Sequence, residues 1–221
     1  MPAMLFNAIG AEEARLQAAF EASTDAMVAL SGDTRVRLLN AAAGIIKSFA
    51  WLDTEPWPVD ADGNGFSLVL NNPPANPDHS LPASWRSSAQ SGGTPGSSNG
   101  TAPPANPAAD TDNDGLAAIV EHALGLDPAT PNGTPVLHTR SQDFVVNNVP
   151  GTYLVLDFTR SLTADGVTIT PELSTTLTSW ASSALTYVST RNNGDGTATT
   201  TWRSTDLRAA LSRIFLRLRV E

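Results

Sequence analysis

Hydrophobic and polar residues alternate over long stretches of this chain, most clearly toward the C-terminus. A period of two is typical of β-strands that have one buried face. The expected strands are Tyr153–Phe158, Val167–Ile169, Leu185–Val188, Ala198–Trp202 and Ile214–Val220, with a hairpin turn at Asn192–Gly196. Their short spacing predicts a C-terminal antiparallel β-sandwich over residues 136–221.

The N-terminal part has a weaker β pattern, which begins after a segment of helical period. The expected elements are a short amphipathic helix over Gly10–Ala22 and strands at Arg35–Leu38, Ile46–Trp51 and Phe66–Leu70. We assign residues 1–90 to a partial β domain. Asp60–Gly65 is a hairpin turn in this interpretation, although its aspartates also resemble an incomplete calcium loop.

Residues 91–109 are rich in proline, glycine and serine and contain almost no charge. A segment of this composition cannot bury enough apolar surface to offset the entropy lost on ordering. We therefore expect a linker here, between the first β domain and the rest of the chain.

The segment Asp110–Glu121 matches the calcium-loop pattern D-x-[DN]-x-[DN]-G-x5-E at every position. Calcium binds about six to eight oxygen atoms, which short-spaced carboxylates and one carbonyl can supply from a single loop. The expected calcium ligands are Asp110, Asp112, Asp114, the carbonyl of Leu116, and Glu121. Gly115 allows the left-handed backbone that turns such a loop.

A short helix over Leu116–Leu124 is expected to carry Glu121 and to end at Gly125. The prolines before the loop exclude an entering helix, so residues 110–128 are not a full EF-hand. The unit resembles the half-motifs of dockerin-type and thrombospondin type 3-like repeats. The alternative is an aspartate-rich turn in which Asp112 or Asp114 only caps the helix.

Composition argues against several function classes. The chain has 22 acidic and 13 basic residues, a net charge of -9, and no clustered basic patch for nucleic acid. No apolar run approaches the ~20 residues that membrane insertion needs. Cysteine is absent, and the three histidines lack the spacing of a helical zinc site. We therefore expect a protein without catalytic activity.

Short motifs in residues 35–96 follow one another in the order found in lamin-tail domains. They are Val36–Asn40, Gly44–Phe49, Glu55–Pro58, Asp62–Leu70, Asn76–Asp78, Pro82–Arg86 and Gly92–Gly96. On these motifs the segment resembles the C-terminal half of a lamin-tail domain of secreted bacterial multidomain proteins. The resemblance implies an incomplete immunoglobulin-like sandwich that serves adhesion or interaction, without catalytic residues. The C-terminal β region is similar to β modules of the same proteins.

These features predict a non-catalytic, calcium-stabilised extracellular or cell-surface adhesion or interaction module, whose partner is an unknown protein or polysaccharide. The first residues lack the pattern of a signal peptide, so we expect a fragment of a larger secreted protein. The alternative is an accessory polysaccharide-binding tail of a secreted enzyme. Trp180 and Trp202 would then stack on sugars, although core packing is the commoner role of tryptophan in small β domains.

Overall fold

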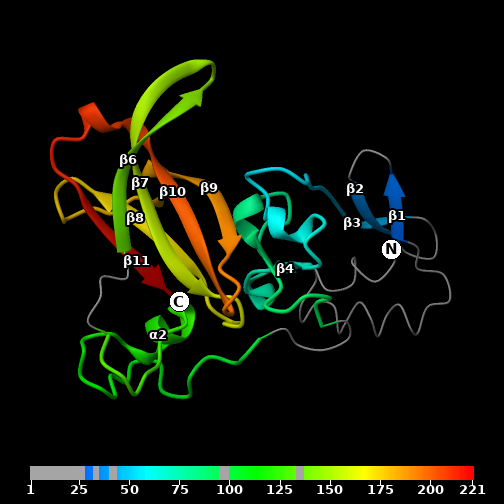
Figure 1. Ribbon diagram of the computed structural model, residues 1–221, viewed down its shortest axis with the longest axis horizontal. Coiled ribbons are helices and arrows are strands. Elements are labelled where there is room, and N and C mark those ends of the chain that lie inside the picture. Colours follow the sequence, from blue (N-terminus) through cyan, green and yellow to red (C-terminus); the bar gives the residue numbers. More distant parts are fainter. Residues whose placement is uncertain (1–27, 32–34, 40–43, 95–99, 133–136) are drawn as a thin grey trace.

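The protein was analysed as a computed structural model that describes residues 28–31, 35–39, 44–94, 100–132 and 137–221. Its described part is mainly β, with eleven strands and one α-helix (Figure 1). The helix expected over Gly10–Ala22 lies outside the described residues. No helix of the described part is long and apolar enough to cross a membrane.

The C-terminal part contains a four-stranded antiparallel sheet and a two-stranded ribbon (Figure 1). The sheet has the order β6 (Leu137–Val146), β7 (Val149–Ser161), β10 (Thr197–Leu207) and β9 (Leu185–Asn192). The ribbon pairs β8 (Ile169–Ser174) with β11 (Phe215–Val220). The expected hairpin turn at Asn192–Gly196 is confirmed, because Asn192 of β9 pairs with Ala198 of β10.

The main hydrophobic core lies between this sheet and the ribbon. Leu154, Leu156 and Phe158 share one face of β7, as their alternation predicts, and all three are buried. They pack with Leu173 of β8 and with partly buried side chains of β11. Two layers that enclose one core are consistent with the predicted β-sandwich.

The other face of β7 is also covered, which alternation alone does not predict. Val155 is 0% exposed, although it points away from the core leucines. Arg140 and Arg203 stand opposite it on the neighbouring strands. The guanidinium group of Arg203 lies 4.8 Å from the ring centre of Tyr153, so long arginine side chains shield this face.

The N-terminal part has two small antiparallel sheets. They are β1 (Val28–Ser31), β2 (Arg35–Leu39) and β3 (Ile45–Ala50) in the first, and β4 (Leu68–Leu70) with β5 (Trp85–Ser87) in the second. Phe49, Trp57, Leu70 and Trp85 form a separate aromatic core. The Trp85 indole donates a hydrogen bond to the carbonyl of His79, which satisfies its buried N–H.

The prediction of a hairpin turn at Asp60–Gly65 is wrong. Strand β3 pairs with β2 and strand β4 with β5, so this segment does not join two paired strands. It contains a single 3-10 turn, Val59–Ala61. The Asp60 carboxylate instead accepts a hydrogen bond from the backbone N–H of Asn192, 2.8 Å away.

The linker expected over residues 91–109 is structured in its second half. Thr101 forms a parallel bridge with Ala164, and its N–H donates to the carbonyl of Thr163. The carbonyls of Pro107 and Ala109 accept hydrogen bonds from the first amides of the helix. The sequence did not reveal this because backbone hydrogen bonds, rather than apolar side chains, hold the segment.

The N-terminal part also contacts the sandwich directly, beside β9 (Figure 1). The buried Arg86 forms an ion pair of 2.6 Å with Asp165, and Asn72 donates a hydrogen bond to Thr168. The side chain of Asn192 reaches Ser87 and the carbonyl of Ser88. The loop at residues 163–168 therefore receives contacts both from the N-terminal part and from Thr101.

Candidate metal centre

The loop that begins at Asp110 turns tightly at two residues with left-handed backbone. Asn113 has a φ of 63° and Gly115 a φ of 92°. A Cβ atom at Gly115 would meet nothing within 4 Å, so glycine serves the backbone conformation here rather than close packing. This confirms the conformation expected for Gly115. No α-helix precedes the loop in the described residues 100–117.

The three loop aspartates face one another. Carboxylate oxygens of Asp110, Asp112 and Asp114 all lie within 4.8 Å of one another. Backbone amides hold them in place: the N–H of Asp114 donates to both Asp110 and Asp112, and the N–H of Gly115 donates to Asp110. A loop that gathers several carboxylates around its own backbone has the arrangement that cations with oxygen ligands require.

Glu121 lies on helix α2 (Ala118–Leu124), which follows the loop. Its side chain belongs to the largest fully buried groups of the described residues, and its Oε2 atom has no hydrogen-bond partner. Burial raises the pKa of Glu121, and the charges of Asp112, Asp114 and Asp110 raise it further. The atoms that lie within 4.8 Å of one another belong to the three aspartates, and Glu121 lies outside this group but close enough for their charges to raise its pKa.

Helix α2 starts two residues later than expected and ends where expected. Gly125 has a φ of 76°, and its N–H donates to the carbonyl of Glu121. Ala123 and Leu124 are buried against the sandwich, and Leu124 belongs to its main core. The helix thus fixes Glu121 relative to the β layers (Figure 1).

Asn132 is a residue of this centre that the sequence motif missed. Its backbone N–H donates to Asp114 at 2.7 Å, and its side-chain amide lies 3.5 Å from Oε1 of Glu121. The hydrogen bonds from Asn132 and from Leu116 lower the pKa of Asp114. Asn132 lies beyond the end of the motif, so spacing could not have indicated it.

Leu116 lies half-buried beside the loop, and its N–H donates to Asp114 at 2.8 Å. Its role as a carbonyl ligand stays a prediction. Asp112 carries a second buried oxygen, Oδ2, that has no partner. Two orphaned carboxylate oxygens in one acidic cluster fit a hard divalent cation, because such an ion supplies the charge and the bonds that these oxygens lack.

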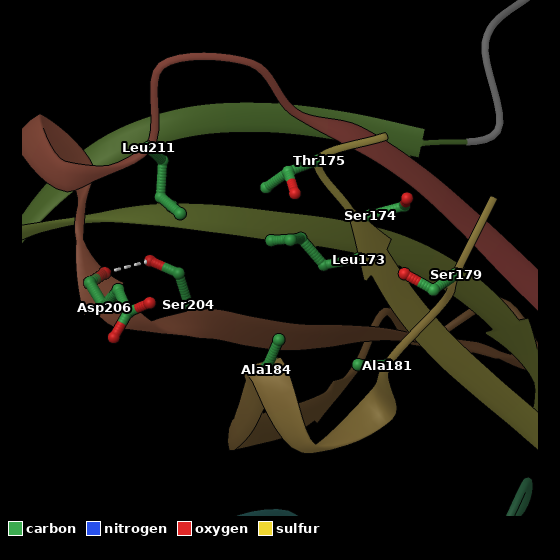
Figure 2. Close-up of a pocket in the computed structure, with 9 residues that line it drawn as sticks. All are labelled: Leu173, Ser174, Thr175, Ser179, Ala181, Ala184, Ser204, Asp206 and Leu211. Atoms are coloured by element: carbon green, nitrogen blue, oxygen red, sulfur yellow. Dashed lines mark hydrogen bonds between the residues drawn. The ribbon is translucent and has the colours of Figure 1, made fainter. Parts of the chain in front are cut away.

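A small cavity at the other end of the sandwich offers no comparable chemistry (Figure 2). It measures about 220 Å³ and lies beside Leu173, Ala184 and Leu211. The hydroxyl of Ser204 donates to the carbonyl of Asp206 and accepts from the N–H of Leu154. Asp206 also lines this cavity, but the Ser204 hydroxyl donates to its backbone carbonyl and not to its carboxylate.

None of the five tryptophans, all of which lie in the described residues, is an exposed platform for sugars. Trp57 and Trp85 are buried, and the others are half-buried. The guanidinium group of Arg217 lies 4.4 Å from the ring centre of Trp180 and covers it. These positions favour the packing role of tryptophan over open stacking on polysaccharide.

No known protein family, curated protein or solved structure matches this chain.

Proposed function

We propose that this chain is a non-catalytic, calcium-stabilised module for adhesion or interaction at the cell surface or outside the cell, within a larger secreted protein. The proposed metal ligands are Asp110, Asp112, Asp114, the carbonyl of Leu116, and Glu121. The proposal includes the lamin-tail-like, immunoglobulin-like character of the N-terminal part, which rests on the motif order. The partner is a protein or a polysaccharide.

The observation that carries the calcium proposal is the state of Glu121. A fully buried carboxylate beside three aspartates has an oxygen without a partner. Like charges gathered in one cluster destabilise the folded state, whereas a divalent cation would convert the repulsion into attraction. A simple helix cap would need only one of these aspartates and would leave Glu121 unexplained.

The role proposed for calcium is structural. Glu121 and Leu124 lie on the same short helix, and Leu124 belongs to the main core. An ion that binds Glu121 would therefore join the loop to the sandwich. At ten times its dissociation constant, the ion would add about 1.4 kcal/mol to the free energy of unfolding.

Thermal unfolding with calcium and then with a chelator tests this role. At ten times the dissociation constant we expect calcium to raise the melting temperature by about 3–6 °C, and the chelator to reverse the rise. Magnesium should raise it less, because that smaller ion demands near-octahedral geometry. Asp110→Asn keeps the size of the side chain and should remove most of the calcium shift, because the first position of the calcium-loop pattern admits only aspartate.

Asp62→Asn is the matched control, because Asp62 is an exposed aspartate in the other acidic turn of the chain. The control should keep the full calcium shift. No shift in the unaltered protein, or an equal shift in Asp110→Asn, would contradict the calcium proposal.

The affinity measured by calorimetry tests the proposed location. Extracellular calcium modules bind with dissociation constants of about 10⁻⁴–10⁻³ M, whereas cytosolic sensors and buffers bind at ~10⁻⁵ M or tighter. We expect a value in the extracellular range, because no α-helix enters the loop in the described residues 100–117. A submicromolar value would argue against an extracellular module.

A further inference from the structure

A cavity of about 400 Å³ lies where the N-terminal part meets the sandwich. Buried side chains, including Arg160, Ser84 and Val167, line its base. Exposed residues, including Thr168, Ser182 and Ser183, line its mouth. The cavity is thus open to solvent on one side and reaches a buried arginine on the other.

Arg160 lines this cavity as a buried cation that forms no ion pair of its own with the described residues. The residue is 8% exposed, and its Nε atom has no hydrogen-bond partner among the described residues. The carboxylate of Asp165 acts on its charge, but this carboxylate is already bound to Arg86. Arg86 is itself 0% exposed and has two further nitrogen atoms without partners.

Two buried guanidinium groups therefore share one carboxylate. Buried charges in proteins are ordinarily paired, because an unpaired charge has lost its hydration without replacement. Burial, together with the positive charge of Arg86, lowers the pKa of Arg160 to about 9. The imbalance indicates that a negatively charged group completes this site.

The cavity also offers neutral hydrogen-bonding groups. The indole N–H of Trp202 and the Oδ1 atom of Asn71 are buried without partners, and both residues line the cavity. Tyr187 packs edge-on against Trp202, with ring centres 5.5 Å apart, and so restrains the indole. Thr170 and Ser183 add hydroxyl groups. Such a mixture of donors and acceptors suits a ligand that carries several hydroxyl groups.

We propose that this cavity binds a sugar acid through its carboxylate, with Arg160 as the anchoring residue. The planar guanidinium group matches a carboxylate in shape and charge. The neutral donors and acceptors would then bind the ring hydroxyls. Because ligand cavities measure about 300–1,000 Å³, a cavity of about 400 Å³ suits a single sugar unit better than a longer chain.

The inference goes beyond the calcium proposal and does not depend on it, because none of the loop carboxylates lines this cavity. An Arg160→Met variant should keep the full calcium shift of the melting temperature.

Calorimetric titration of the full chain with sodium glucuronate, at one fixed calcium concentration, tests the inference. We expect saturable binding with one site per chain, and binding of glucose and of acetate that is on the order of 10- to 100-fold weaker. Glucose lacks the charge, and acetate lacks the hydroxyl groups. Tryptophan fluorescence should respond to glucuronate, because Trp202 lines the cavity.

Two variants and one control locate the binding. Arg160→Met should weaken glucuronate binding on the order of 10- to 100-fold, because it removes the anchoring charge. Ser183→Trp should also weaken it, because the larger side chain fills the mouth of the cavity and leaves the buried charge in place. Arg191→Met should bind normally, because Arg191 is an exposed arginine that pairs with Glu55 outside the cavity. The inference is overturned by an absence of binding, by binding that survives both variants, or by equal affinity for acetate or inorganic sulfate.

Discussion

At the scale of a single residue, the buried charge of Glu121 favours a cation as its binding partner. Its side chain is fully buried, and the charges of Asp112, Asp114 and Asp110 raise its pKa. Replacement by glutamine should therefore have opposite effects with and without calcium, because it removes both the repulsion and a ligand charge.

In chelator we expect Glu121→Gln to melt at a higher temperature than the unaltered protein, since the amide keeps the shape without the charge. In calcium the variant should lose most of the stabilisation, about 1.4 kcal/mol at ten times the dissociation constant. Thermal unfolding under both conditions measures the two effects. A variant that is less stable in chelator and still gains the full calcium shift would show that Glu121 is not a ligand.

The same residues show what spacing can and cannot predict. The order of aspartates and glycine correctly places Asp110, Asp112 and Asp114 together, because the loop conformation is local. The role of Glu121 as a fourth ligand stays a prediction. Asn132 reaches Asp114 from beyond the helix, and the charge of Arg86 acts on Arg160, which lies on a distant strand. Contacts of this kind follow from tertiary packing, for which a single sequence carries no pattern.

At the scale of elements, helix α2 depends on the sandwich more than on its own hydrogen bonds. It has only seven residues, which is too short for an isolated helix to be stable in water. Leu124, which is 2% exposed, provides much of its attachment to the core.

Leu124→Ala should lower the free energy of unfolding by about 2–5 kcal/mol, because it removes buried methyl groups and leaves a cavity. Leu81→Ala is a matched control, since Leu81 is 52% exposed, and should change the stability by at most ~0.5 kcal/mol. Chemical denaturation measures both. Equal effects of the two substitutions would mean that α2 is not anchored by Leu124.

The β8–β11 ribbon contains an acidic residue whose titration gives a pH prediction. Glu172 on β8 accepts hydrogen bonds from Arg217 and Arg219 of β11. The hydrogen bond from Arg217 is the main cause that lowers the pKa of Glu172 below its usual 4.5. A carboxylate with a lowered pKa stabilises the fold when it is charged, so its contribution is complete above about pH 4.5 and is lost as the pH falls further.

We therefore expect Glu172→Gln to be less stable than the unaltered protein at neutral pH and equally stable in strong acid. Urea denaturation over this pH range measures the difference in the free energy of unfolding between the two proteins. The titration of all other carboxylates cancels in this difference. A difference that does not change with pH would contradict an electrostatic role of Glu172.

Strand elements were the most predictable part of the fold. The alternation in β7 indicated its core face, Leu154, Leu156 and Phe158, without knowledge of partners, although it did not predict the burial of the opposite face. The pairing of β4 with β5 was not predictable, because the intervening residues contain 3-10 turns and no strong hairpin signal. The turn at Asp60 serves a distant contact with Asn192, so its local composition was misleading.

On the scale of the whole molecule, the N-terminal part and the sandwich are joined through a buried ion pair. Arg86 is 0% exposed, and its partner Asp165 is 27% exposed. Removing one member of such a pair leaves the other charge buried and uncompensated.

Asp165→Asn should lower the free energy of unfolding by on the order of 3 kcal/mol, the lower end for buried pairs, because Asp165 is partly hydrated. Calorimetric melting should show a fall of about 6–12 °C. Glu55→Gln breaks the exposed pair with Arg191 and should cost at most ~1 kcal/mol. If both variants melt alike, the Arg86–Asp165 pair does not stabilise the junction.

The contacts of the loop at residues 163–168 make it a poor site for insertions or cleavage. It contacts Arg86, Asn72 and Thr101, and the carbonyl of Asp165 also lies 3.5 Å from the ring of His122 on α2. A protease nick or an inserted tag in this loop would disturb every part of the molecule that meets there. The exposed turn at Asn147 and Asn148, at the tip of the projecting β6–β7 hairpin (Figure 1), is the better place to attach a label or to open the chain for circular permutation.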